Sequence, residues 1–259
     1  MPTLELAGLR VEFYRTGSGP DLLLLHSLLT ELTVFERVLP QLAATHRVIR
    51  INLPGFGRSD PVELQTVADH ADHVSRVMQA LELPPGTDVF GNGFGAFVAA
   101  ELAVRHGSRF NRLVLADVVA AFPEAARVPF RVMAEKVRAG GMSAVLDAAI
   151  ARMFPPEFAA RNADTVAARK ATLAAVSPEC FARACLALAA LDLTPRLGTL
   201  RNRTLVLCGA LDQTTPPALA RDLAAKIPGA LYKEIPGSGH CPMLEQPETL
   251  VEFLREFLA

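Results

Sequence analysis

Two residues in the last fifth of the chain have the types and positions needed for acid–base chemistry. Asp212 lies in a turn that follows the apolar run 204–208, and His240 lies in a Gly-Ser-Gly-His segment after the apolar run 231–235. A neutral imidazole accepts a proton near pH 7, and a carboxylate on its other ring nitrogen selects the tautomer and stabilises the imidazolium. Either residue alone would be an ordinary loop residue. Because both follow strand ends, we predict that Asp212 and His240 form a hydrogen-bonded acid–base pair.

A glycine-rich corner at residues 88–96 is the second candidate for chemistry. Its sequence, Asp-Val-Phe-Gly-Asn-Gly-Phe-Gly-Ala, predicts a short strand, a sharp turn centred on Gly93 and the start of an Ala-rich helix. Glycine suits such a corner, because backbone angles that cost other residues about 1–3 kcal/mol cost it nothing.

The remaining pattern alternates strands and helices, which predicts an α/β protein with a mostly parallel sheet and helices on both faces. An N-terminal hairpin is expected over 4–15. Buried strands are predicted at 21–25, 47–51, 88–92, 112–117, 204–208 and 231–235, and helices at 34–42, 66–81, 95–105, 217–226 and from about 248. The carboxyl ends of parallel strands meet at one edge of a sheet, so the loops holding the chemical residues should gather there.

Residues 118–196 break this alternation. The segment is Ala-rich, apolar and helical in pattern, and it is punctuated by Pro and Gly with no strand. We therefore expect a helical cap at 118–196 inserted into a core formed by 1–117 and 197–259. A small, largely apolar substrate would bind between them. Possible lining residues are Phe130, Met133, Met142, Met153 and Phe154, although most of these should only pack the cap onto the core.

Composition narrows the class of protein. The 259 residues are 51% hydrophobic and 20% charged, with 26 basic against 27 acidic side chains, so no basic excess favours nucleic acid. No apolar run reaches the roughly 18 residues of a membrane span, and no secretion signal is recognisable, so we expect a cytoplasmic location. The four cysteines should be thiols, mostly buried. The expected partner is a small-molecule substrate, and we expect no cofactor, metal, nucleic acid or membrane to bind. The sequence leaves open whether the protein forms a homo-oligomer.

Nearly the whole chain resembles the α/β-hydrolases, in particular the capped members that act on lactones, esters and carbon–carbon bonds. Their nucleophile corner is Gly-x-Ser-x-Gly, and 91–95 matches it except that Gly93 stands where the serine would be. The order nucleophile, acid, histidine is matched at Asp212 and His240. The resemblance further implies an oxyanion hole from the N–H groups of Leu28 and Phe94, and a substrate-facing loop at His26 and Ser27, where Ser27 replaces the family's usual glycine.

Gly93 leaves several functions open. The main hypothesis is hydrolysis of a small ester, lactone or activated carbon–carbon bond, with the nucleophile lost by engineering or by natural change and the covalent route impaired. The alternative is a non-hydrolytic role for His240 and Asp212 in proton transfer, as in a lyase, cyclase or cofactor-free oxygenase, or a ligand-binding pseudoenzyme. A triad that lacks one member can still accelerate a reaction about 10³–10⁴-fold over water.

Simpler roles compete at several positions. His26 is expected to bond nearby backbone. Ser27 could act as a displaced nucleophile, but a loop hydroxyl usually bonds backbone, which is the role favoured here. Asp117 is expected to make a cap or loop hydrogen bond, although it could be an alternative acid for His240. Cys241 adjoins His240 in sequence, yet side chains of neighbouring residues on an extended segment diverge.

The same corner also fits a different class of protein. Gly91-x-Gly93-x-x-Ala96 satisfies the dinucleotide-binding pattern, and Asp117 ends the following strand where a ribose-binding acid would stand. Such patterns usually occur in the first strand of the cofactor-binding unit, whereas two buried strands precede this one. The dinucleotide interpretation also leaves Asp212 and the His240 segment without a role, so we favour the hydrolase fold.

Overall fold

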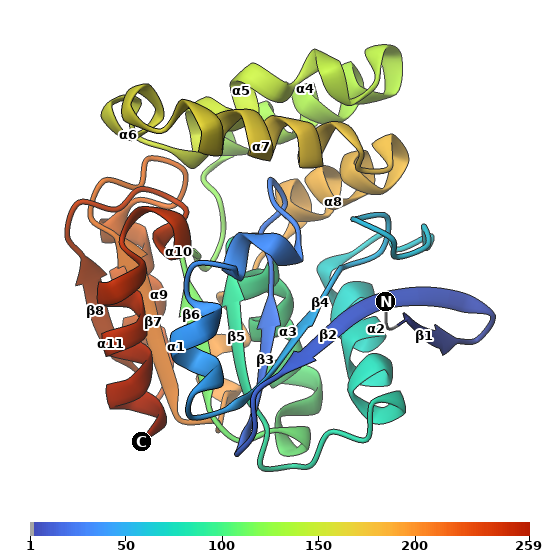
Figure 1. The fold of residues 1–259 in the computed structure, drawn as a ribbon. Helices are drawn as coiled ribbons and strands as arrows, with labels where there is room; N and C mark the ends of the chain where they lie inside the picture. The colour runs from blue at the N-terminus through green and yellow to red at the C-terminus, as the bar shows by residue number, and fades with distance from the viewer. Residues whose placement is uncertain (1–2) are drawn as a thin grey trace.

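An eight-stranded sheet forms the centre of the molecule in the computed structural model, which describes residues 3–259 (Figure 1). The strands run in the order β1-β2-β4-β3-β5-β6-β7-β8, with β2 antiparallel to both of its neighbours and β3 to β8 parallel to one another. Continuous apolar runs form the middle strands because helices cover both of their faces. The strands are β1 Thr3–Leu6, β2 Leu9–Thr16, β3 Asp21–Leu25, β4 Arg47–Ile51, β5 Asp88–Asn92, β6 Leu113–Ala116, β7 Thr204–Gly209 and β8 Leu231–Ile235.

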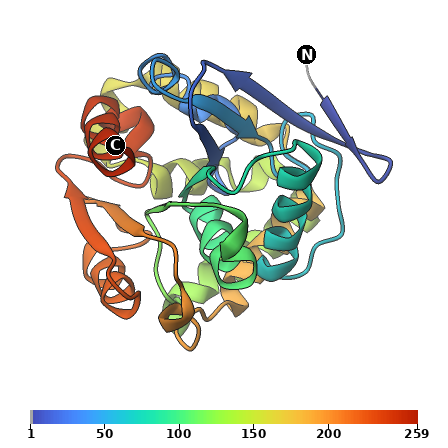
Figure 2. The same ribbon diagram turned by 90° about the horizontal axis from the view of Figure 1, so that it is seen from below.

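Helices pack on both faces of this sheet. On one face lie α1 (Leu39–Ala43) and α11 (Pro247–Leu258). On the other lie α2 (Val67–Ala80), α3 (Phe94–His106) and α9 (Pro217–Lys226), as the view from below shows (Figure 2). The α/β-hydrolase fold expected from the sequence is thus confirmed.

A layer of helices lies over the carboxyl ends of the parallel strands (Figure 1). Its chain leaves the sheet after β6 and returns before β7. The buried ion pair between Glu31 and Arg169, 3.2 Å apart, ties this layer to the loop after β3, and Arg37 donates to Thr165 Oγ1 at 3.0 Å. We call α4 to α8 the helical layer: α4 Glu124–Gly140, α5 Leu146–Met153, α6 Pro156–Arg161, α7 Ala163–Ala174 and α8 Pro178–Ala190.

The predicted helix at 34–42 is not continuous. The structure has a 3₁₀ turn, Leu32–Phe35, followed by the short α1 with Pro40 in its first turn. Proline has no N–H to bond back to the preceding turn, so it begins a helix instead of continuing one. A second departure is α10 (Pro242–Glu245), a single turn after His240 that the sequence pattern did not indicate.

Among residues 3–259, no single helix is long and apolar enough to cross a membrane. The pair α7 and α8, bent by 100° at its break, reaches the required length and hydropathy only when the two are taken together. All four cysteines are free thiols with buried side chains, as expected.

Candidate active site

The candidate residues follow the carboxyl ends of five parallel strands and lie at the same edge of the sheet. Ser27 follows β3, Gly93 follows β5, Asp117 follows β6, Asp212 follows β7 and His240 follows β8. The rule that parallel strands present their chemistry at this edge therefore describes the molecule well.

Asp212 and His240 form a buried hydrogen-bonded pair. Asp212 Oδ2 lies 2.8 Å from His240 Nδ1, and both side chains are almost inaccessible to solvent. The N–H groups of Thr214 and Thr215 and the Thr215 hydroxyl also donate to the carboxylate, at 2.7, 3.1 and 2.5 Å. A carboxylate fixed in this way places the proton on Nδ1 and leaves Nε2 as the acceptor, as a general base requires.

Glu245 holds the loop that carries His240. Its carboxylate accepts from the N–H of Gly239 at 2.6 Å and from that of Cys241 at 2.8 Å, on either side of the histidine. Burial raises the pKa of Glu245 to about 7. Sequence patterns did not predict this pair of contacts, because they form only when the turn α10 folds back toward Gly239. Cys241 is fully buried, and burial raises the pKa of its thiol well above the usual range, so the thiol is not a nucleophile in this environment.

Asp117 lies behind the pair as a second, fully buried acid. It accepts from the N–H of Gly209 at 2.9 Å and from the amide of Asn92 at 2.7 Å, so it has the hydrogen-bonding role expected of it. Burial and the charge of Asp212 raise the pKa of Asp117 well above its usual range. The pKa of Asp212, in contrast, is lowered by His240 and Thr215, so the environments of the two carboxyl groups push their pKa values apart.

The hydrogen bonds of this cluster bear on two other kinds of site, a metal site and a ribose-binding site. One ligand atom each of Asp117, Asp212 and His240 lies within 4.8 Å of the others, a spacing that a cation could span. Protein donors already bond both carboxylates, and His240 Nδ1 faces Asp212, so the donor set fits an acid–base cluster better than a metal. A ribose is excluded at Asp117, whose buried carboxylate is turned toward Gly209 and Asn92.

Gly93 forms the sharp corner between β5 and α3. Its φ of 52° and ψ of −119° lie in a region that L side chains rarely adopt. The flanking glycines are needed for packing, because a Cβ on Gly91 would meet the backbone of Gly95, and a Cβ on Gly95 would meet the carbonyl of Leu25. These contacts and the φ of Gly93 account for the glycines at 91, 93 and 95 without any phosphate.

The N–H groups of Leu28 and Phe94 are available for a ligand. Neither donates a hydrogen bond to another residue within 3–259, and both residues line the cavity in front of His240. Two preorganised donors beside a base form the arrangement that stabilises a developing oxyanion.

The cavity is small and lies between the helical layer and the core. Its volume is about 20 Å³, enough for about one water molecule. Of the five predicted lining residues, Phe130 and Met133 line it, Met153 and Phe154 line a neighbouring cavity of about 90 Å³, and Met142 is buried away from both. Most of its wall is apolar: Leu28, Leu29, Phe94, Phe97, Phe122, Phe130, Met133 and Leu188.

Arg152 is a polar lining residue that sequence analysis missed. It comes from α5, its guanidinium lies 5.1 Å from the centre of the Phe130 ring, and it lines both cavities beside His240. Burial lowers the pKa of Arg152. No carboxylate within residues 3–259 forms an ion pair with it, although buried cations are usually paired. The Ala-rich pattern of α5 gave no sign that this arginine points inward.

His26 does not reach the cavity. Its Nδ1 lies 2.8 Å from the carbonyl oxygen of Ser27, its Nε2 accepts from the N–H of Leu53 at 3.0 Å, and its ring packs on Phe56. Both ring nitrogens therefore bond backbone, and the proposed substrate contact finds no geometric support. Ser27, in contrast, lines the cavity beside Gly93.

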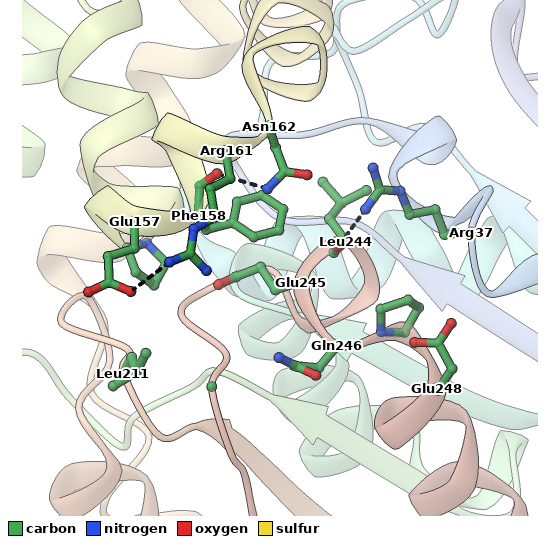
Figure 3. Close-up of a pocket in the computed structure, with 13 residues that line it drawn as sticks. Arg37, Glu157, Phe158, Arg161, Asn162, Leu211, Leu244, Glu245, Gln246 and Glu248 are labelled. Carbon is green, nitrogen blue, oxygen red and sulfur yellow. Dashed lines mark hydrogen bonds and ion pairs between the residues drawn. The ribbon is translucent and has the colours of Figure 1, made fainter.

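A larger groove of about 750 Å³ opens on the surface between α6 and the start of α11 (Figure 3). Arg37, Phe158 and Arg161 lie along it, and Arg161 faces Glu157 (Figure 3). Neither Gly93, Asp212 nor His240 lines this groove, so size alone does not locate the chemistry. His240, Leu28 and Phe94 line the small cavity instead.

The pKa of His240 predicts how the site responds to pH. Burial favours the neutral ring, but the charge and hydrogen bond of Asp212 outweigh it and raise the pKa of His240 above 6.5. Since only the neutral ring accepts a proton, we expect activity to fall as pH drops through this raised value. Asp212→Asn should lower the maximal rate and move the acid limb of the kcat/KM profile to lower pH. An unmoved acid limb would show that another group sets it.

Comparison with known proteins agrees with this geometry. Residues 22–253 match the alpha/beta hydrolase family. The chain is 28% identical to 3-oxoadipate enol-lactonase 2 of Acinetobacter baylyi, over 95% of this chain and 91% of that one. It is 32% identical over 98% of its length to polyketide synthase ThaQ of Burkholderia thailandensis, of which it spans only 12%.

Solved structures show the same similarity. The enol-lactonase from Burkholderia xenovorans LB400 superposes with a TM-score of 0.92 at 27% identity, covering 99% of both chains. A thermophilic esterase from Thermogutta terrifontis follows with a TM-score of 0.90 at 28% identity, over 99% of this chain and 97% of that one. With the sheet order, the corner at Gly93 and the family match over 22–253 in agreement, the chain belongs to the alpha/beta hydrolase family.

Proposed function

We propose that this protein hydrolyses a small, largely apolar ester or lactone, or an activated carbon–carbon bond, in the cavity beneath the helical layer. The observation that carries the proposal is the 2.8 Å bond between Asp212 and His240, where His240 lines a cavity together with Leu28 and Phe94. Relatives named as enol-lactonases, methyl ester esterases and carbamate hydrolases support this class of reaction.

In this proposal the core is 1–117 with 197–259, and residues 118–196 act as a cap. The cap supplies Phe130, Met133 and Arg152 to the cavity, while the core supplies the base and the oxyanion donors. Gly93 provides no hydroxyl, so His240 has to act on a hydroxyl from elsewhere, either a water molecule or another side chain.

The alternative within the same fold is proton transfer without hydrolysis, as in a lyase, cyclase or cofactor-free oxygenase. It is favoured by one observation, namely that the corner residue is glycine while the acid–base pair beside it is complete. A pseudoenzyme that only binds its ligand is the third possibility.

A panel of short-chain aryl esters and lactones, followed by acid release in a pH-stat, tests the proposal. Hydrolysis by the chain as written, absent in Asp212→Asn, supports it. If no panel member is hydrolysed, but the protein exchanges a substrate C–H proton with deuterated solvent, the proton-transfer alternative replaces it. Saturable binding with neither reaction would indicate a pseudoenzyme.

Arg152 refines the proposed substrate. An inward-facing guanidinium without a carboxylate partner in an apolar cavity is suited to a ligand anion, because charge-assisted hydrogen bonds strengthen when water is excluded. We therefore propose that the preferred ester or lactone carries a carboxylate that reaches Arg152.

Arg152→Met should preserve bulk while removing the charge. We expect KM for a carboxylated ester to rise roughly 10–150-fold, corresponding to the ~1.5–3 kcal/mol of a charged hydrogen bond. The uncharged methyl ester of the same compound provides the control, and its KM should change little. Equal changes for both substrates would show that Arg152 acts only through packing.

A further inference from the structure

The position that a nucleophile would occupy at Gly93 is already filled. A Cβ built on Gly93 would lie less than 3.0 Å from Ser27 Oγ and 2.9 Å from His240 Nε2. The serine hydroxyl and the basic nitrogen thus border the same point, one from the loop after β3 and the other from the loop after β8. A serine side chain at 93 could not be added without displacing Ser27.

Ser27 is held in this position by its backbone. Its carbonyl oxygen accepts from the N–H of Thr30 at 3.2 Å and from the Thr30 hydroxyl at 3.3 Å, and it lies 2.8 Å from His26 Nδ1. His26 in turn bonds the N–H of Leu53, so the loop is braced against the segment after β4. These hydrogen bonds fix the backbone of Ser27, from which the side chain reaches the cavity.

The Ser27 hydroxyl is unpaired in the part of the chain that the structure describes. It makes no hydrogen bond with any residue within 3–259, although the side chain is only 1% exposed, whereas a loop serine usually bonds backbone. Ser27 lines the cavity, so its hydroxyl is placed to meet a ligand bound there. A serine here is explained if its hydroxyl is used when a ligand binds.

We propose that Ser27 is the nucleophile of this chain and takes the place left by Gly93. The proposal rests on the hydrolytic function proposed above and names the hydroxyl on which His240 acts. Sequence alone favoured a backbone-bonding role for Ser27, and the unpaired hydroxyl beside His240 Nε2 reverses that preference. Catalytic hydrogen bonds often form only when substrate is present, so direct contact with the imidazole is not required beforehand.

The reaction follows from the positions of the groups. Ser27 Oγ attacks the carbonyl carbon of the ester or lactone and gives its proton to His240 Nε2, while the N–H groups of Leu28 and Phe94 bind the oxyanion. The bond between the carbonyl carbon and the alkoxy oxygen of the ester then breaks, and the leaving alkoxide takes the proton from the imidazolium. Water next attacks the acyl–Ser27 ester and passes a proton to His240. Ser27 leaves, regains that proton, and the acid is released.

A fluorophosphonate probe with peptide mapping by mass spectrometry tests this assignment. We expect the wild-type chain to be labelled on Ser27, with labelling and ester hydrolysis falling about 10³-fold or more in Ser27→Ala. Ser143→Ala is the matched control, because Ser143 is an exposed serine that lines neither of the cavities beside His240. In the double variant Ser27→Gly/Gly93→Ser the label should move to position 93.

The outcomes separate this inference from the hydrolytic function. If Ser27→Ala hydrolyses esters as fast as wild type while His240→Ala does not, Ser27 is not the nucleophile, and hydrolysis through activated water stands. If only the double variant is labelled and active, the inference also fails, and the wild-type chain has lost its nucleophile. If neither chain reacts although both are folded by circular dichroism, the inference and the hydrolytic function fail together.

Discussion

Replacing His240 by alanine should reduce ester hydrolysis by about 10²–10⁴-fold, the usual contribution of a positioned general base. Among residues 3–259, the change removes the only imidazole that lines the cavity, while it spares Leu28, Phe94 and Arg152. The fold should survive, because Asp212 keeps its bonds from the N–H groups of Thr214 and Thr215. The measurement is kcat/KM for the best substrate of the panel, with circular dichroism as the check on folding.

His106→Ala supplies the control for this loss. His106 is also a histidine next to an aspartate, with its Nε2 2.6 Å from Asp72 Oδ1, but it lies at the carboxyl end of α3, away from the cavity. We expect its activity to stay near that of wild type. Should His240→Ala retain most of its activity, no version of the proposed acid–base mechanism would survive.

Gly95→Ala should cost more than about 3 kcal/mol in the free energy of unfolding. Its Cβ would meet the carbonyl oxygen of Leu25 and come within 2.7 Å of that of His26, both of which are backbone atoms at the end of the central strand β3. Helix α3 would have to move off the sheet, carrying the corner at Gly93 with it. Urea unfolding monitored by circular dichroism measures the loss.

Gly86→Ala is the matched substitution for the stability measurement. No atom lies within 4 Å of the position its Cβ would take, and its φ is not positive. We expect a change of about 0.5 kcal/mol or less. If the two alanine variants unfold at the same urea concentration, Gly95 is not required for the close packing of α3 on β3.

Local pattern predicted most of the fold, because continuous apolar runs and Pro or Gly breaks specify buried strands and their ends. Helix α9 and strand β8 occupy the predicted ranges, and the strand-end rule placed Asp212 and His240 at one edge. The prediction failed at 34–42, where an apolar spacing of helical type spans two short turns and Pro40 begins the second.

Side-chain orientation was beyond the reach of sequence patterns. Whether Arg152 points into the cavity depends on how α5 rotates against the sheet, and whether the Ser27 hydroxyl is paired depends on which backbone groups its neighbours already use. The pair of contacts made by Glu245 likewise exists only once α10 has folded. These contacts join segments far apart along the chain, and no local spacing encodes them.

The 20 Å³ cavity has a consequence for the speed of ligand capture. Pockets that hold drug-sized molecules measure roughly 300–1,000 Å³, so we expect a substrate to bind only after the helical layer has moved against the core. Stopped-flow traces should therefore level off at high ligand concentration, at a ceiling set by the protein's own opening rate.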